Sequence, residues 1–329
     1  MPPLRATLLL CLSALLGLTP VVAAQEPGGS AQPSIPKLIR IIVPFSAGAS
    51  NDAIARALSP SLAKRLETSV IVENRPGAAG VIGADAVAKS PRDGSVLLLT
   101  SSTFLTAAAT QPRLPYDPIA AFSPIGIVGQ NPSLLAVSSS TPFKTAAELF
   151  SAARAKPGEI TYGSAGVGSV GHMATELMNA AAKVQMSHVP YKGAANSAID
   201  LAGGQIHAMI SSYATLSAFI KTGKVRVLAV TSKQPHPSFP DVPPLINTVP
   251  GFSNEVWVGV FAPVGTPAAF VERVNREING ISASPELKPL LESDGMMPAA
   301  VSPPAFSARI KQELVQWKQI AAARKIVAE

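Results

Sequence analysis

Two segments far apart in the sequence share one pattern: an apolar strand, a turn rich in small residues, and an amphipathic helix. The first reads IIVPFSAGASND over residues 41–52, and the second reads ITYGSAGVGSVGH over residues 160–172. Small residues let a ligand approach the backbone of such a turn. The helix that follows directs unpaired N–H groups and the positive end of its dipole toward that ligand. The two turns together predict a cleft that holds a small anion from both sides.

The first residues have the features of an export signal. Arg5 precedes an uncharged apolar run from Ala6 to Leu18, and the small residues Val22-Ala23-Ala24 follow. This pattern predicts a signal peptide over residues 1–24 that is cleaved after Ala24. The apolar run is too short to span a membrane as a helix.

Composition and charge indicate how the mature chain is stabilised and which partner they argue against. The single cysteine, Cys11, falls within the expected signal peptide, so the mature chain relies on a hydrophobic core and not on disulfides. Its length is ample for two domains. The formal net charge is +7, but Lys and Arg are scattered and form no run. This argues against a nucleic-acid partner, which usually requires a clustered basic patch.

From residue 38 onward, apolar strands alternate with helices, which predicts parallel sheets covered by helices on both faces. Strands are expected at residues 38–43, 70–73, 96–100, 125–128, 134–138, 187–189, 206–210 and 225–231, and helices at 50–66, 145–155, 194–201, 216–221, 266–281, 285–293 and 303–326. The pattern is completed by the strand and helix of the second segment described above and by a short Ala-rich helix that ends at Lys89.

Pro-rich stretches at residues 113–124 and 235–250 interrupt this alternation and favour two α/β lobes, between which the chain crosses twice. The expected boundaries are a disordered leader at 25–35, lobe one at 36–135 plus 255–329, and lobe two at 136–254. A cleft between lobes is a favoured ligand site, and two crossings form a hinge.

The second turn also matches a dinucleotide fingerprint, Gly166-x-Gly168-x-x-Gly171. The acidic residue expected after the next strand is missing, because residues 185–190 read QMSHVP. The same glycines suit a smaller anion, and no cofactor is expected. Hydrolase chemistry has little support, since the chain contains no Gly-x-Ser-x-Gly and its four histidines lack metal-ligand spacing. No catalytic residue and no metal site are therefore predicted.

Several side chains near the turns have two open interpretations. Ser50 is a candidate N-cap of the first helix. Asp52 either braces the turn or meets a donor group on the ligand, because a free carboxylate there would repel an anion. His172 either lines the cleft or caps its helix. Lys192 is either a cation near the cleft or a solvated turn residue.

Further motifs run along the whole mature chain. They are the first turn with Val43-Pro44-Phe45, VENRPGAAG at 72–80, LPYDP at 114–118, YGSAG at 162–166, HVPYKG at 188–193, LAVTS at 228–232 and APVGTP at 262–267. With these motifs the chain resembles the Bug-type extracytoplasmic solute receptors of tripartite tricarboxylate transporters. Together the motifs are specific to that family, although each alone is weak.

The resemblance implies an α/β, type II periplasmic-binding-protein fold whose two lobes close on a ligand. It implies a periplasmic binding protein, not an enzyme, that delivers a small di- or tricarboxylate or aromatic acid to membrane permease subunits. A monomer is expected. A ligand sensor for a signalling partner is the alternative, and a secreted hydrolase is a third possibility.

The family's ligand contacts carry over to both turns. On the first lobe they map to Phe45, Ala47, Gly48, Asn51 and Asp52, with Ser101 as a further candidate, and on the second to Ser164, Gly166, Gly168, Ser169 and His172. Two departures stand out. The first turn has one glycine between Ala47 and Ala49 where relatives usually have paired glycines. Ser211-Ser212 stands where many relatives carry an acid and an amide, which predicts a preference for a plain or aromatic acid.

Overall fold

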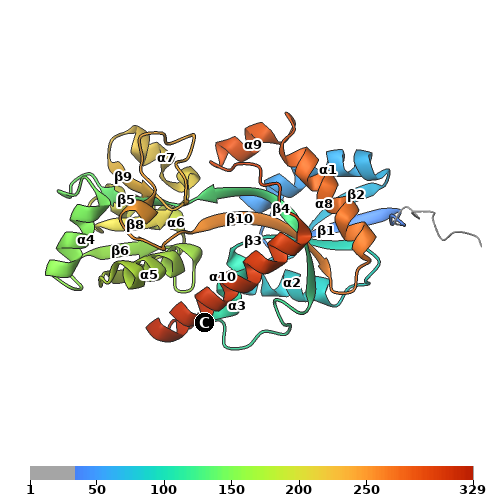
Figure 1. Ribbon diagram of the computed structural model, residues 1–329, viewed down its shortest axis with the longest axis horizontal. Helices are drawn as coiled ribbons and strands as arrows, with labels where there is room; N and C mark the ends of the chain where they lie inside the picture. Colours follow the sequence, from blue (N-terminus) through green and yellow to red (C-terminus); the bar gives the residue numbers. More distant parts are fainter. Residues whose placement is uncertain (1–33, 329) are drawn as a thin grey trace, which may run out of the picture. The chain divides into compact units, whose positions relative to one another are not determined.

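The structure is a computed structural model that describes residues 34–328. The expected signal peptide, its cleavage site and most of the expected leader lie outside the described residues. Within the described part, two five-stranded sheets are present (Figure 1). Each sheet with the helices that pack on it is called a lobe below. The predicted α/β class with two lobes is confirmed, whereas the lobe boundaries stay a prediction.

Lobe one contains the sheet with strand order β2-β1-β3-β10-β4. Its strands are β1 (Leu38–Val43), β2 (Ser69–Asn74), β3 (Val96–Ser101), β4 (Phe122–Pro132) and β10 (Glu255–Pro263). Its helices are α1 (Ser50–Leu66), α2 (Val81–Ala88), α3 (Thr103–Thr110), α8 (Ala268–Ser282), α9 (Lys288–Ser293) and α10 (Pro303–Arg324), with a 3-10 turn η1 (Ala78–Gly80).

Lobe two contains the sheet with strand order β7-β6-β8-β5-β9. Its strands are β5 (Leu134–Ser138), β6 (Thr161–Ser164), β7 (Ser187–Pro190), β8 (Ala208–Ser211) and β9 (Val225–Val230). Its helices are α4 (Ala146–Ala155), α5 (Val170–Ala182), α6 (Ala194–Ala202) and α7 (Tyr213–Lys221), and a 3-10 turn η2 (Leu245–Asn247) follows β9. In each sheet the antiparallel fourth strand, β10 or β5, arrives from the other lobe.

Helix α1 shows why the local pattern folds as expected. Ile54, Leu58, Leu62 and Leu66 repeat every four residues and are at most 4% exposed. They lie in the core cluster that α1 shares with α8 on one face of the first sheet. This spacing places all four side chains on one helix face, and the observed bounds of α1 equal the predicted ones.

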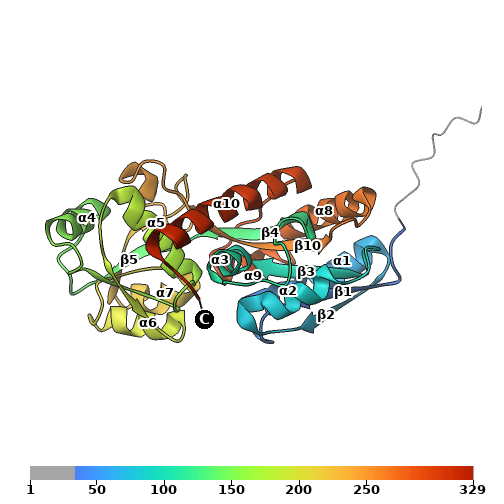
Figure 2. The same cartoon turned by 90° about the horizontal axis from the view of Figure 1, so that it is seen from below.

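One hydrophobic core runs through both lobes. It includes Leu98 and Trp257 from lobe one, Leu135 and Met178 from lobe two, and Trp317 of α10. Helix α10 contacts both α3 of lobe one and α5 of lobe two, as Figure 2 shows. The lobes are therefore joined by packing as well as by the two crossings.

The two crossings are linked at a buried threonine. Thr231 lies where the chain leaves β9, and its hydroxyl accepts from the Ser133 N–H at 2.8 Å. The same hydroxyl lies 2.5 Å from the carbonyl oxygen of Asn254, just before β10. The Thr231 N–H donates to the Ser133 carbonyl at 3.0 Å. The positions where the chain changes lobes are thus held together by direct hydrogen bonds.

The strand register brings the predicted site segments to one region. Ser101 at the end of β3 pairs with Val258, which on its other side pairs with Gly129 of β4. A few residues further along the chain, Leu134 at the start of β5 pairs with Ser211 at the end of β8. The carboxyl ends of β1 and β3 are therefore joined, through the β4–β5 crossing, to the carboxyl ends of β6 and β8. We call this region the interlobe edge.

Candidate functional site

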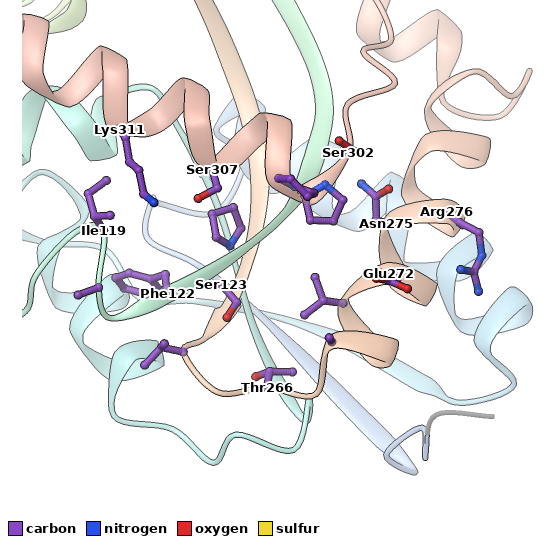
Figure 3. Close-up of a pocket in the computed structure, with 17 residues that line it drawn as sticks. Ile119, Phe122, Ser123, Thr266, Glu272, Asn275, Arg276, Ser302, Ser307 and Lys311 are labelled. Atoms are coloured by element: carbon purple, nitrogen blue, oxygen red, sulfur yellow. The ribbon is translucent and has the colours of Figure 1, made fainter. Parts of the chain in front are cut away.

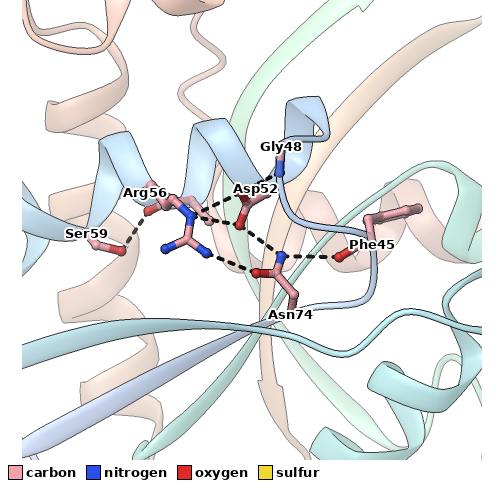
Figure 4. Close-up of polar contacts among 7 residues, drawn as sticks. Phe45, Gly48, Asp52, Arg56, Ser59 and Asn74 are labelled. Atoms are coloured by element: carbon pink, nitrogen blue, oxygen red, sulfur yellow. Dashed lines mark hydrogen bonds and ion pairs between the residues drawn. The ribbon is translucent and has the colours of Figure 1, made fainter.

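The first turn is held by the carboxylate of Asp52 (Figure 4). Its oxygens accept from the Gly48 N–H at 2.9 Å, from Arg56 Nε at 3.0 Å and from Asn74 Nδ2 at 2.9 Å. The Asn74 amide also donates to the Phe45 carbonyl at 3.2 Å. The hydrogen bond from Arg56, followed by that from Gly48, lowers the pKa of Asp52 to about 2. Asp52 is therefore charged, only 3% exposed, and braces the turn.

The start of helix α1 lacks a side-chain cap. The N-cap residue is Ala49, which has no side-chain acceptor, so the prediction of Ser50 as N-cap is wrong. Ser50 is the first helical residue, and its hydroxyl donates to the Asp294 carboxylate. Within the described chain, the N–H groups of Ser50, Asn51 and Asp52 have no hydrogen-bond acceptor, and the first helical bond runs from Ala53 to Ala49. An anion at this helix end would find three free donors.

The second turn is shaped by its own side chains. The buried Ser164 hydroxyl accepts from the Gly166 N–H at 3.1 Å and lies 2.7 Å from His188 Nε2. The Gly168 N–H donates to His172 Nδ1 at 3.1 Å, so this donor is already engaged. Ser169 caps helix α5 by accepting from the His172 N–H. The ring of His172 therefore holds the turn, and its N–H donates to the Ser169 cap.

Two histidine rings stack behind the second turn. His172 and His188 have ring centroids 3.8 Å apart and planes 9° apart, and Tyr162 stacks on His188 at 5.0 Å. Burial lowers the pKa of each histidine to about 4, and for His188 the neighbouring His172 lowers it further. Both rings are consequently neutral at neutral pH. The Tyr162 hydroxyl donates to Glu176 at 2.7 Å, and Glu176 pairs with Arg324 at 3.0 Å.

The C-terminal segment closes this region from lobe one. Residues 324–327 and the two histidines line a cavity of about 320 Å³. The Ala328 N–H donates to the Thr110 carbonyl at 3.0 Å. A Cβ at Gly168 would lie 2.8 Å from Thr110 Oγ1 and 3.1 Å from Ala328 Cβ. The second turn therefore packs against α3 and against the chain end.

Replacing Gly168 by alanine is expected to destabilise the fold and weaken ligand binding. The residue has a φ of +76°, which costs a non-glycine residue about 1–2 kcal/mol, and the added methyl would push the turn off Thr110. Gly223 is a matched control, because its φ is +69° and nothing lies within 4 Å of a Cβ there. Urea unfolding should show a larger loss for Gly168→Ala than for Gly223→Ala. Equal losses would contradict the contact with Thr110.

The remaining predicted residues lie at the interlobe edge. Ser101 ends β3 and its hydroxyl lies 3.3 Å from Thr103 Oγ1. Ser211 ends β8, and Ser212 caps helix α7. Lys192 is exposed. The structure thus places the predicted residues in the two turns and at the ends of β3 and β8. Among residues 34–328, no hydrogen bond or ion pair joins the two turns directly.

Sequence reasoning missed four residues that hold these turns: Arg56, Asn74, His188 and Asp294. Arg56 follows Asp52 by four helical positions, a spacing that signals an ion pair. The other three come from distant strands and a distant helix, and nothing local connects them to the turns. In the described part of the chain, no group of three or more His, Cys, Asp or Glu residues could hold a metal.

A larger pocket lies elsewhere in lobe one (Figure 3). It measures about 930 Å³ and is lined by α8, the start of α10 and the segments 119–124 and 264–268. The segment 119–124 includes the start of β4, and the segment 264–268 follows the end of β10. The pocket therefore lies at the ends of these strands that are opposite the interlobe edge. None of the predicted site residues lines it.

Comparison with known proteins identifies the family. The family model described as tripartite tricarboxylate transporter family receptor matches residues 54–326. The UPF0065 protein in the tcbD-tcbE intergenic region of Pseudomonas sp. strain P51 is 37% identical over 281 residues, or 85% of this chain and 84% of that protein. Protein BugT of Bordetella pertussis is 33% identical over 282 residues, or 85% and 86%.

Solved structures agree with this result. The TctC solute binding protein from Polaromonas, without ligand, has a TM-score of 0.78 and 30% identity over 87% of this chain and 98% of that one. Rpa4515 of R. palustris with adipate has a TM-score of 0.73 and 32% identity over 88% and 98%. MatC from Rhodopseudomonas palustris with bound malate has a TM-score of 0.70 and 27% identity over 86% and 98%.

These relatives are solute-binding receptors and not enzymes, in line with the absence of a predicted catalytic residue. Among the described residues, no helix is long and apolar enough to cross a bilayer. The two sheets, the two turns at their joined edges and the family match together show that the chain belongs to the receptor family of tripartite tricarboxylate transporters.

Proposed function

We propose that the protein is a periplasmic receptor that binds a small carboxylate at the interlobe edge and delivers it to the membrane permease of a tripartite transporter. The observation that carries the proposal is the uncapped start of α1. Among the described residues, three N–H groups there have no acceptor, because the N-cap residue Ala49 has no side-chain oxygen. The neighbouring carboxylate of Asp52 is already paired with Arg56. Adipate and malate, the ligands of two relatives, are both carboxylates.

The magnitudes are sufficient for binding without an arginine clamp. A helix N-terminus contributes about 0.3–1 kcal/mol toward an anion, and up to ~2 kcal/mol when partly buried. Each hydrogen bond to a charged group contributes about 1.5–3 kcal/mol. Three or four such bonds with two helix ends can reach the roughly 8 kcal/mol that micromolar affinity requires. Among residues 34–328, the N–H groups of Val170 and Gly171 at the start of α5 also have no acceptor, so the second lobe adds two donors.

A thermal-shift screen against carboxylates tests the proposal. A ligand that binds only the folded protein raises the melting temperature, by an amount that grows with ligand concentration. Purified protein lacking residues 1–24 should show this shift with at least one di- or tricarboxylate or aromatic acid, and not with the matching amides. Matching amides keep the carbon skeleton but remove the charge, so equal shifts by acid and amide would overturn carboxylate recognition.

A further inference from the structure

We propose that Asp294 determines ligand specificity, and that the ligand carries an amino or hydroxyl group beside its carboxylate. This inference rests on the proposed function and narrows its ligand class. Asp294 directly follows helix α9. Its side chain accepts a hydrogen bond from the Ser50 hydroxyl at the uncapped start of α1, and its carbonyl oxygen accepts from Asn131 Nδ2 at 3.2 Å.

The neighbours of Asp294 place it at the interlobe edge. Ser50 follows β1, and Asn131 is the penultimate residue of β4. The next residue, Gly295, packs against lobe two, because a Cβ there would lie 3.3 Å from Cβ of Tyr213. Tyr213 comes directly after Ser211-Ser212. The segment at Asp294 therefore contacts the start of α1, the end of β4 and the start of α7.

The charge of Asp294 is not neutralised within the described chain. Asp52 has Arg56 as its partner, whereas no Lys, Arg or His nitrogen lies within 4.0 Å of the Asp294 carboxylate. The amide oxygen of Asn131 is also buried and has no donor. The Asp294 carboxylate thus accepts from Ser50 but has no cationic partner, and the Asn131 amide oxygen has no donor. A ligand with only carboxylate oxygens would repel Asp294, while an adjacent ammonium or hydroxyl would bind it.

This placement changes the expected preference. Ser211-Ser212 carries no charge, and the sequence alone predicted a preference for a plain or aromatic acid. Asp294 comes from a different segment, and the next residue, Gly295, packs on Tyr213, which directly follows Ser211-Ser212. With the Asp294 carboxylate beside the start of α1, a 2-amino or 2-hydroxy acid becomes the favoured class.

Matched ligand series test the inference by calorimetry. The probes are succinate, malate and aspartate; glutarate, 2-hydroxyglutarate and glutamate; and phenylacetate, mandelate and phenylglycine. Within each series only the group beside one carboxylate changes. In the series that binds, the hydroxy or amino acid should bind at least about tenfold more tightly than the plain acid, the size expected for one hydrogen bond to a charged group.

The variant Asp294→Asn should reduce this ratio by about tenfold while binding the plain acid unchanged or more tightly. Asparagine can still accept from Ser50, so the fold should be retained. Glu292→Gln is the matched control, because its side chain is 60% exposed and pairs only with Lys288. The control should leave the ratio unchanged.

Two results would overturn the inference. One is a plain acid that binds the unmodified protein as tightly as its amino and hydroxy counterparts, a comparison that requires no variant. The other is an unchanged ratio in a folded Asp294→Asn variant. Failure of every probe, including the plain acids, would instead reject the proposed carboxylate receptor and the inference with it.

Discussion

Lowering the pH from about 6.5 to about 4 is expected to destabilise the folded protein by several kcal/mol through His172 and His188. Burial lowers the pKa of both rings from 6.5 to about 4. As the pH falls, the unfolded chain takes up protons first, so stability is lost between these two values. A shift of this size corresponds to about 3 kcal/mol for one histidine.

The local contacts explain why a proton is costly here. His172 Nδ1 accepts from the Gly168 N–H. A proton on that nitrogen would break this hydrogen bond and leave two N–H donors pointing at each other. A second positive charge would lie in the ring stacked 3.8 Å away. Acid should therefore open the second turn, and ligand affinity should fall in the same pH range as stability.

A double variant isolates this effect from other acid titrations. In His172→Asn/His188→Gln, the asparagine oxygen takes the place of Nδ1 beside Gly168, and the glutamine amide takes the place of Nε2 beside Ser164. Neither side chain titrates. Urea unfolding at several pH values should show a steep loss for the unmodified protein and a much flatter profile for the variant. Parallel profiles would show that the histidines do not titrate in this way.

Local periodicity predicted much of the fold, and long-range pairing explains the rest. Helix α1 was predicted with its observed bounds because its apolar repeat is unbroken. Strand β10 was missed because it follows a Pro-rich crossing and contains Gly259, which reads as a break. In the structure a Cβ at Gly259 would lie 2.6 Å from the ring of Phe306, so close packing requires the glycine. Helix α3 was missed because it is short and rich in Ala and Thr.

The candidate site shows the same division. The two turns could be recognised because their glycines and following helices are contiguous in the chain. The roles of Asp52 and His172 could not, since each depends on partners from other elements, Asn74 for one and His188 for the other. Asp294 could not be recognised for the same reason, because the neighbours of its segment, Ser50, Asn131 and Tyr213, come from α1, β4 and α7.

Replacing Asp52 by alanine is expected to weaken ligand binding at least about tenfold, although it removes a negative charge near an anion site. Each hydrogen bond that the carboxylate accepts stabilises the ordered turn by roughly 1.5–3 kcal/mol, and the variant loses these bonds. Repulsion between Asp52 and a ligand several ångströms away in a wet site is about 1 kcal/mol or less. The loss of the brace should therefore outweigh the gain from removing the charge.

Calorimetry with the carboxylate that gives the largest thermal shift measures this change. Asp85→Ala is the matched control, because Asp85 also pairs with a cation four residues on, Lys89 at 2.7 Å, but its carboxylate makes no hydrogen bond to the first turn in the described chain. The control should bind normally. Tighter binding by Asp52→Ala would mean that Asp52 acts on the ligand chiefly by repulsion, contrary to the bracing role.

The stability of a second variant, Asp52→Asn, should show how the contribution of Asp52 depends on pH. The pKa of Asp52 falls from 3.8 to about 2 on folding, so its charge stabilises the protein above about pH 4, and this contribution is lost as the pH falls through 2. Because the side chain of Arg56 is 53% exposed, we expect about 1–2 kcal/mol. The stability difference between the unmodified protein and Asp52→Asn should thus shrink only below pH 4, outside the range in which the histidines titrate. A difference that shrinks between pH 6.5 and 4 would assign the acid sensitivity of the first turn to another group.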